Sequence, residues 1–260
     1  MSEYIDTHAH YDDLADYPDR EEVLRRLEAE GVSAVINAGS TPRSVREGLA
    51  LARAHGFIWA AAGLHPNCAE EITEAEFAEM AALARSAILK KEKLVAIGET
   101  GLDYHYSKNT EIQARWFRRH LALARELELP VIIHSREAGE DTMNILKEET
   151  LPAGGVIHCF SGDLAQAREY IAMGFHIGVG GVVTFKKAEA LKKVAAEIPI
   201  ESLLLETDCP YLSPEPRRGE RNDSANLKYI AAKIAELRGV SADELLEKTN
   251  ASARKLFRLI

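Results

Sequence analysis

The sequence predicts an α/β fold, specifically a (β/α)₈ TIM barrel with an extra C-terminal helix. Short apolar or β-branched segments alternate with helical patterns along all 260 residues, and eight of these segments are typical of strands. Eight βα units in about 250 residues is the usual size of this barrel. The strand segments are too apolar for a sheet with one exposed face, so we expect burial on both faces. No Gly-x-Gly-x-x-Gly motif follows a strand, which disfavours the open doubly wound sheet.

The predicted strands are recognised by β-branched and apolar residues bounded by polar or turn residues. In chain order they are Tyr4–Thr7, Ser33–Ala38, Ile58–Leu64, Leu94–Ile97, Val131–Ile133, Gly155–Ile157, Phe175–Val179 and Leu203–Leu205.

The predicted helices follow from apolar spacing and from capping residues. They include Arg20–Glu30, Pro42–His55, Glu111–Leu127, Glu140–Glu149, Leu164–Met173, Ala188–Glu197 and Ala225–Leu237. Ser40-Thr41-Pro42 gives the second of these a capping residue followed by a proline at about its first position. Ser241, with Glu244 in the capping-box position, starts the extra helix Ser241–Ile260.

Composition and charge limit the class of protein. The formal net charge is −9 and 46% of the residues are hydrophobic, without any apolar stretch near the roughly 20 residues of a membrane span. Met1-Ser2-Glu3 offers no basic region of a signal peptide, and the three cysteines form no Cys-x-x-Cys pair. We therefore expect one domain over residues 1–260, in a cytoplasmic monomer with no membrane or obligate protein partner. Because the chain is acidic, contact with a phosphate would need local positive charge or bound metal.

Metal-ligating side chains follow five of the predicted strands. His8 and His10 follow the first strand, two residues apart, so both imidazoles point the same way. Glu99 follows the fourth strand on the parity of Val95 and Ile97. The remaining three end the fifth, sixth and eighth strands: His134, His158 and Asp208. The carboxyl ends of barrel strands meet at one edge, and barrel closure brings the eighth strand beside the first.

Four histidines and two carboxylates suit a pair of divalent cations, with Mg, Mn or Zn as candidates. A lone His-x-His motif is weak, because two histidines on a strand can simply pack. Six metal-ligating side chains at five strand ends are hard to arrange by coincidence, and they favour a metal centre.

The sequence also resembles the TatD family of metal-dependent hydrolases, within the amidohydrolase-like superfamily. The matching segments run through the chain in the family's order: Ile5-Asp6-Thr7-His8-Ala9-His10, Gly63-Leu64-His65-Pro66, Ala96–Tyr104, Val131–Arg136, Ile157–Gly162, Glu206–Leu212 and Pro216–Asn222. The loop Tyr104–Ser107 falls where the family varies. The resemblance implies a deoxyribonuclease in which His8, His10 and Asp208 hold one metal, His134 and His158 hold the other, and Glu99 bridges them.

The resulting expectation is hydrolysis of DNA phosphodiester bonds, as a 3′-end exonuclease on single strands, by a metal-activated water. Asp208 is expected to take the proton of that water, with Glu99 as the second catalytic carboxylate. Two divalent ions and two carboxylates leave a local charge of +2 (+4 − 2), which can hold a phosphate in an acidic protein.

Further residues near the strand ends have two interpretations each. Glu206 shares the parity of Asp208 and is either a hydrogen-bond acceptor for a ligand histidine or part of an internal ion pair. The substrate contacts we predict are His65, Arg136, Arg218 and Arg221. Their alternatives are a loop-packing histidine for His65, and surface ion pairs or a solvated loop for the arginines.

Three other functions remain open at this stage. A metal-activated water attacks carbonyl as well as phosphoryl centres, so an ester hydrolase such as a D-aminoacyl-tRNA deacylase fits the same residues. An amidase or lactonase of the wider superfamily is disfavoured, since those sites often use a carboxylated lysine where this chain has Glu99. A non-catalytic, metal-stabilised binding protein is disfavoured because it has no need of Asp208 as a base.

Overall fold

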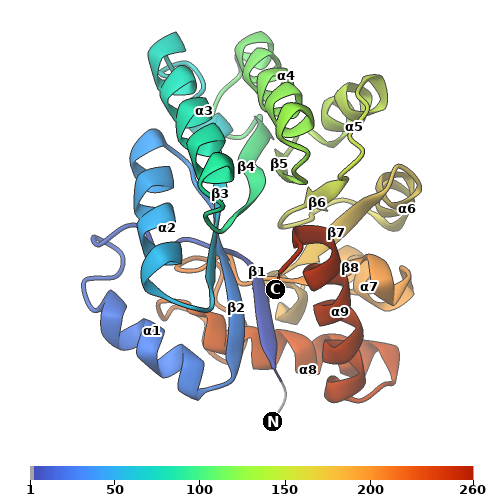
Figure 1. The fold of residues 1–260 in the computed structure, drawn as a ribbon. Helices are drawn as coiled ribbons and strands as arrows, with labels where there is room; N and C mark the ends of the chain where they lie inside the picture. The colour runs from blue at the N-terminus through green and yellow to red at the C-terminus, as the bar shows by residue number, and fades with distance from the viewer. Residues whose placement is uncertain (1–2, 260) are drawn as a thin grey trace.

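The computed structural model describes residues 3–259 and is built around one eight-stranded parallel sheet. Its strands follow one another in the order β1 to β8, and an isolated bridge between Ala9 and Cys209 joins the first strand to the segment after the last. The predicted (β/α)₈ barrel is confirmed (Figure 1). The strands are β1 Tyr4–Ala9, β2 Val32–Asn37, β3 Ile58–Ala62, β4 Leu94–Asp103, β5 Val131–Arg136, β6 Gly155–Ile157, β7 Phe175–Val179 and β8 Leu203–Leu205.

Helices surround the strands on the outside of the barrel (Figure 1). They are α1 Arg20–Ala29, α2 Pro42–Ala54, α3 Glu74–Leu89, α4 Thr110–Leu127, α5 Gly139–Glu148, α6 Leu164–Ala172, α7 Glu189–Glu197, α8 Leu227–Arg238 and α9 Ala242–Phe257. Short 3₁₀ helices are η1 Pro66–Cys68, η2 Gly181–Thr184, η3 Ile200–Ser202 and η4 Ser224–Asn226. The predicted extra helix is α9, whose N-cap Ser241 accepts from the Glu244 N–H. The last residue predicted for it, Ile260, and the leading Met1-Ser2 lie outside the described residues.

Two apolar cores hold the barrel together. The larger core contains strand residues such as Val35 and Ile133 together with residues from most of the helices. The second core takes the alternate strand positions, among them Ile36, Ile132 and Leu204, together with Phe257 of α9. Because strand side chains alternate, the second core is the barrel interior, and the end of α9 packs against it.

The structure contains one helix that was not predicted, and three strands run further than predicted. The helix α3 was overlooked, although Thr73 and Glu76 form a capping box at its start. β1, β4 and β5 extend further than predicted, so His8, Glu99 and His134 lie within strands rather than after them.

Simple alternation along β4 does not explain the direction of Glu99. Ile97 belongs to the larger core, facing the helices, whereas Glu99 faces the interior. A register irregularity lies between Ile97 and Thr100, where β4 advances three residues while β5 advances two. Such an irregularity re-aims a side chain, and here it turns Glu99 inward.

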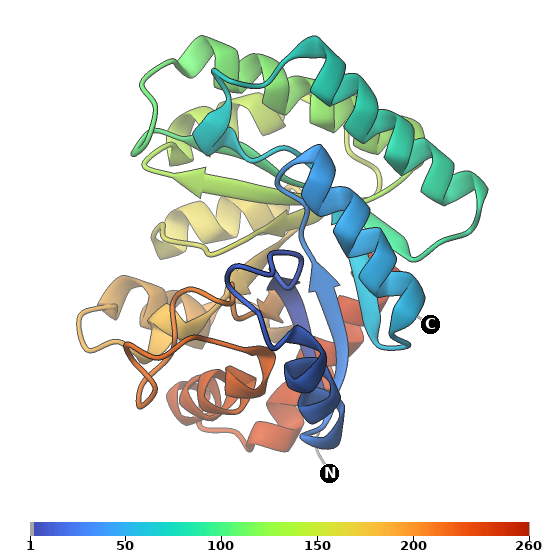
Figure 2. The same cartoon turned by 90° about the vertical axis from the view of Figure 1, so that its left-hand side faces the viewer.

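The loops that follow the strands form one end of the barrel, which we term the mouth. Figure 2 shows the long segment after β8, in orange, on the left, across the molecule from the C-terminus. Within residues 3–259, every helix is too short or too polar to cross a membrane.

Candidate metal centre at the barrel mouth

Glu99 is the centre of the site. Its buried carboxylate faces five imidazoles, and each oxygen faces its own set. Oε2 lies 3.2 Å from His8 Nε2 and 3.7 Å from His10 Nε2. Oε1 lies 3.3 Å from His65 Nε2, 2.8 Å from His134 Nδ1 and 3.4 Å from His158 Nε2. One carboxylate thus presents a separate oxygen to each of two histidine groups.

The first group is completed by Asp208. Its Oδ1 lies 3.5 Å from His10 Nε2, 3.8 Å from His8 Nε2 and 4.0 Å from His158 Nε2. His8 and His10 bring their Nε2 atoms within 3.1 Å of each other, and the His8 ring stacks on the His158 ring at 3.5 Å between centroids. The barrel seam sets this geometry, because the Asp208 N–H donates to the His8 carbonyl at 2.9 Å.

The second group contains His134 and His65, whose ring centroids are 4.5 Å apart. The His134 nitrogen that faces away from Glu99, Nε2, lies 2.9 Å from Oδ2 of the buried Asp103. The other oxygen of Asp103 accepts from the backbone N–H groups of His105 and Tyr106. Asp103 therefore fixes which nitrogen of His134 points at Glu99.

Glu206 has the same relation to His158. Its Oε1 lies 3.2 Å from His158 Nδ1 and accepts from the Cys159 N–H at 2.6 Å. This contact is the internal ion pair named as one interpretation of Glu206, and it places the carboxylate beside a candidate ligand histidine.

Opposite charges in this enclosed space shift the pKa values. Burial raises the pKa of Glu99 and of Asp208, but the surrounding histidines outweigh it and hold the pKa of both carboxylates below their usual values. Burial lowers the pKa of His8. It also acts on His10 and His158, where neighbouring carboxylates prevail and raise the pKa to about 9 and about 10. Protons on His10 and His158 thus supply positive charge between the carboxylates.

The residues present fit divalent cations. Three sets of ligand atoms each lie close enough to hold one ion: His8 with His158 and Asp208, His8 with His10 and Glu99, and His65 with Glu99 and His134. The close approach of two imidazole nitrogens, at 3.1 Å, is unfavourable unless a proton or a cation lies between them. Imidazole and carboxylate are the donors that Zn, Mn and related ions accept.

The structure brings together all six predicted ligands, and His65 with them. His65 was predicted as a substrate contact, yet its Nε2 faces the carboxylate of Glu99, as a ligand would. Asp103 lies within the family-matching segment Ala96–Tyr104, but no role was predicted for it. Its position could have indicated a role, since Asp103 ends β4 and His134 lies on the neighbouring strand β5.

The three predicted arginines have different surroundings. Arg136 is exposed, and its guanidinium lies 5.2 Å from the ring centre of Tyr106. Arg218 is exposed and covers Phe185 at 4.0 Å. Arg221 is held by Asp19 through two hydrogen bonds of 2.7 Å, the surface ion pair named as its alternative. A phosphate contact by Arg221 has to compete with this carboxylate.

Close approach of backbone explains the glycine at position 63, beside the site. A Cβ added there would lie 2.4 Å from the Glu99 carbonyl oxygen and 2.5 Å from the Gly98 carbonyl carbon. Only glycine lets the segment after β3 approach the backbone of Glu99 this closely.

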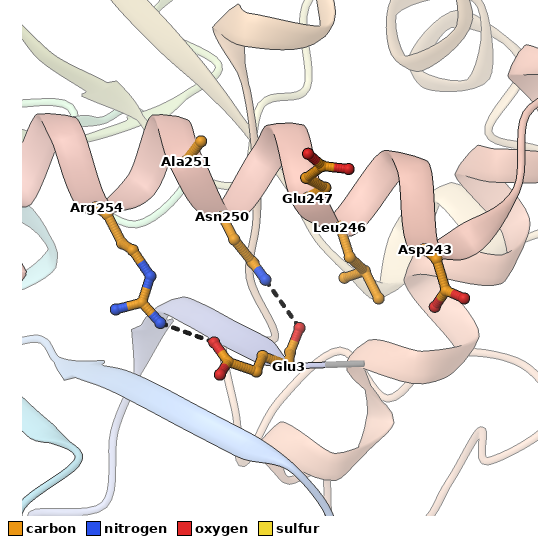
Figure 3. Close-up of a pocket in the computed structure, with 7 residues that line it drawn as sticks. All are labelled: Glu3, Asp243, Leu246, Glu247, Asn250, Ala251 and Arg254. Carbon is orange, nitrogen blue, oxygen red and sulfur yellow. Dashed lines mark hydrogen bonds and ion pairs between the residues drawn. The ribbon is translucent and has the colours of Figure 1, made fainter. Parts of the chain in front are cut away.

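A hollow at the other end of the barrel is unrelated to this centre. It lies between α9 and the residue before β1, where Arg254 and Asn250 both bond to Glu3 (Figure 3). These contacts fasten the last helix to the start of the first strand.

A parallel barrel with imidazoles and carboxylates converging at its mouth defines a metal-dependent hydrolase. The family model described as TatD related DNase matches residues 5–258, and the chain belongs to this TatD family. A Bacillus subtilis protein named uncharacterized metal-dependent hydrolase YabD is 44% identical over 257 residues, covering 98% of this chain and 99% of that protein. An Erwinia tasmaniensis protein named 3′-5′ ssDNA/RNA exonuclease TatD is 38% identical over 250 residues, covering 93% and 94%. The crystal structure of the Escherichia coli TatD homologue YjjV superimposes with a TM-score of 0.90 at 33% identity, covering 99% and 98%.

Proposed function

We propose that the protein is a metal-dependent deoxyribonuclease that removes nucleotides from the 3′ ends of single-stranded DNA. The observation that carries the proposal is Glu99, with one oxygen toward each histidine group. A carboxylate so placed suits two cations, and a pair of cations is a common device for phosphodiester hydrolysis. The exonuclease name of the Erwinia relative supports the choice of a 3′ end.

The residues divide the work between them. His8, His10 and Asp208 would hold one cation, His134 and His158 the other, with Glu99 shared and His65 on the side of His134. When bound, the cations activate a water for attack and neutralise the phosphate. Asp208 takes the proton of the attacking water on a carboxylate oxygen. Its side chain is 17% exposed and so reaches solvent, and the histidines keep it ionised at neutral pH.

Remaining contacts serve the substrate. Arg136 and Arg218 are two exposed cations at the mouth that suit non-bridging phosphate oxygens. Local positive charge from the loaded centre would offset the net charge of −9, which otherwise repels nucleic acid.

The test follows cleavage of a 5′-labelled single-stranded oligonucleotide with added Mg, Mn or Zn. We expect stepwise shortening from the 3′ end, abolished by chelator and by a blocked 3′ terminus. Asp208→Asn and His134→Ala should each lose at least about 100-fold in rate, the usual cost of removing a proton acceptor or a metal ligand. Asp141→Asn, which removes a carboxylate outside the ligand groups, should behave as the parent.

Two outcomes would contradict the proposal. Equal activity in the parent, Asp208→Asn and His134→Ala would point to a contaminant or another site. Rapid deacylation of D-aminoacyl-tRNA with no release of nucleotides would replace the nuclease with the alternative ester hydrolase.

A further inference from the structure

Exposed apolar side chains gather at the mouth. Within residues 3–259, the exposed large apolar side chains are Leu14, Leu89, Tyr106, Tyr211 and Leu212. Four of the five lie in loops that follow β1, β4 or β8, on the edge of the barrel that carries the ligand groups. Leu89 ends α3, at the opposite edge. The metal centre as described uses none of these four side chains.

Tyr211 stands beside the first ligand group. Its ring centre lies 6.5 Å from that of His10, and 56% of the residue is exposed. The backbone beneath it is fixed at both polar groups, because its N–H donates to the Asp208 carbonyl and its carbonyl accepts from buried Asn222.

Tyr106 stands beside the second ligand group. It is 65% exposed, and its N–H donates to Asp103, the same carboxylate that faces His134. Arg136 lies 5.2 Å from its ring centre on one side, and the His105 ring meets it edge-on at 5.1 Å. This arrangement holds an exposed aromatic face next to a cation.

The strand order places the two tyrosines across the mouth from each other. Consecutive strands are neighbours around the barrel, so β4 and β8 are four strands apart in either direction. A nucleic-acid strand with a phosphate at the metal centre would therefore have one aromatic ring on each side of that phosphate.

We propose that Tyr106 and Tyr211 stack on the bases of the two nucleotides that flank the scissile phosphate of a single-stranded substrate. This inference rests on the proposed nuclease function and names what the mouth recognises besides phosphate. Every base has a π-face, so stacking binds single strands without regard to sequence. In a duplex those faces are covered by neighbouring base pairs, so the two rings favour a frayed or single-stranded end.

The experiment compares two oligonucleotides of one length, one complete and one with abasic residues at the two 3′-terminal positions. The parent should cleave the complete strand faster. Tyr106→Ala and Tyr211→Ala should each lower kcat/KM on the complete strand by about 5- to 150-fold, the range for loss of one stacked base. Neither change should affect cleavage of the abasic strand, because no base is there to stack.

Controls separate stacking from other roles. Tyr106→Phe and Tyr211→Phe keep the ring and should match the parent, as should Leu89→Ala at the far edge. Binding of a 5′-labelled strand with phosphorothioate terminal linkages, followed by fluorescence anisotropy, should weaken in the alanine variants alone.

The outcomes distinguish this inference from the function beneath it. Cleavage of both strands at equal rates, unchanged in the alanine variants, overturns stacking and leaves the nuclease intact. Equal losses on both strands in the alanine variants also overturn it, because that pattern indicates a structural role for the loops. A parent that cleaves neither strand overturns the nuclease function and the inference together.

Discussion

Replacing Asp103 by asparagine should weaken one metal site and spare the other. The carboxylate accepts from two loop N–H groups at 3.0 and 3.2 Å and faces His134 Nε2 at 2.9 Å. An asparagine whose oxygen keeps the two loop contacts turns its NH₂ toward Nε2. His134 then has to accept there and carry its proton on Nδ1, the nitrogen 2.8 Å from Glu99. A cation on that side has to displace this proton.

The size of the effect follows from this single contact. Loss of a carboxylate that orients a ligand histidine typically costs about 10- to 100-fold in metal affinity. That range corresponds to about 1.4 to 2.7 kcal/mol of binding free energy. The group of His8, His10 and Asp208 has no contact with Asp103, so its affinity should change little.

Calorimetric titration of the metal-depleted variant with Zn²⁺ or Mn²⁺ measures both binding steps. We expect Asp103→Asn to weaken one step, and ¹⁵N NMR of the imidazoles to show the His134 proton on Nδ1. Asp141→Asn, in the same neighbourhood but bonded to the Tyr104 hydroxyl, is the matched control. Two binding steps equal to those of the parent would refute the reasoning.

The remaining predictions concern packing, pH and a surface pair. Gly63→Ala should cost about 1–3 kcal/mol of stability and weaken metal binding, because the added Cβ meets the backbone of Glu99. Gly56→Ala is the control, since a Cβ at that position has nothing within 4 Å. Thermal unfolding and metal titration compare the two variants. Burial lowers the pKa of His120, in α4, to about 4, below the 6.5 of the unfolded chain. The free energy of unfolding should therefore fall by about 1.4 kcal/mol per pH unit as the pH drops from 6.5 to 4. Denaturant titrations should show a shallower fall in His120→Gln, and an unchanged slope would contradict this. Arg221→Ala should leave kcat/KM within about threefold and stability within about 1 kcal/mol, since its exposed ion pair contributes little; a large rise in KM would instead assign it to phosphate binding.

The barrel was predictable because its signals are local. Buried parallel strands read as apolar runs, and helix starts carry capping residues such as Ser241. The helix α3 was not predicted because its alanines lie on all sides of the helix. The sequence therefore lacks the distinct apolar stripe on which helix prediction depends.

The convergence of the six candidate ligands was predictable and its finer geometry was not. Residue type and strand position predicted the six side chains that the structure brings together as candidate ligands, but strand alternation fails at the irregularity between Ile97 and Thr100, which no sequence pattern signals. The placement of His65 against Glu99, and of Asp103 behind His134, depends on how neighbouring strands slide past one another. Register of this kind is a property of the assembled sheet.

The seam between β1 and β8 has a consequence for synthesis of the protein. His8 and His10 leave the ribosome early, whereas Asp208 comes with the last strand, and the backbones of the two segments bond directly at the seam. A growing chain in which β8 has not yet been synthesised lacks Asp208, and its barrel cannot close. Under the proposed function, a nascent chain that lacks this last segment would lack Asp208 and would not hydrolyse nucleic acid.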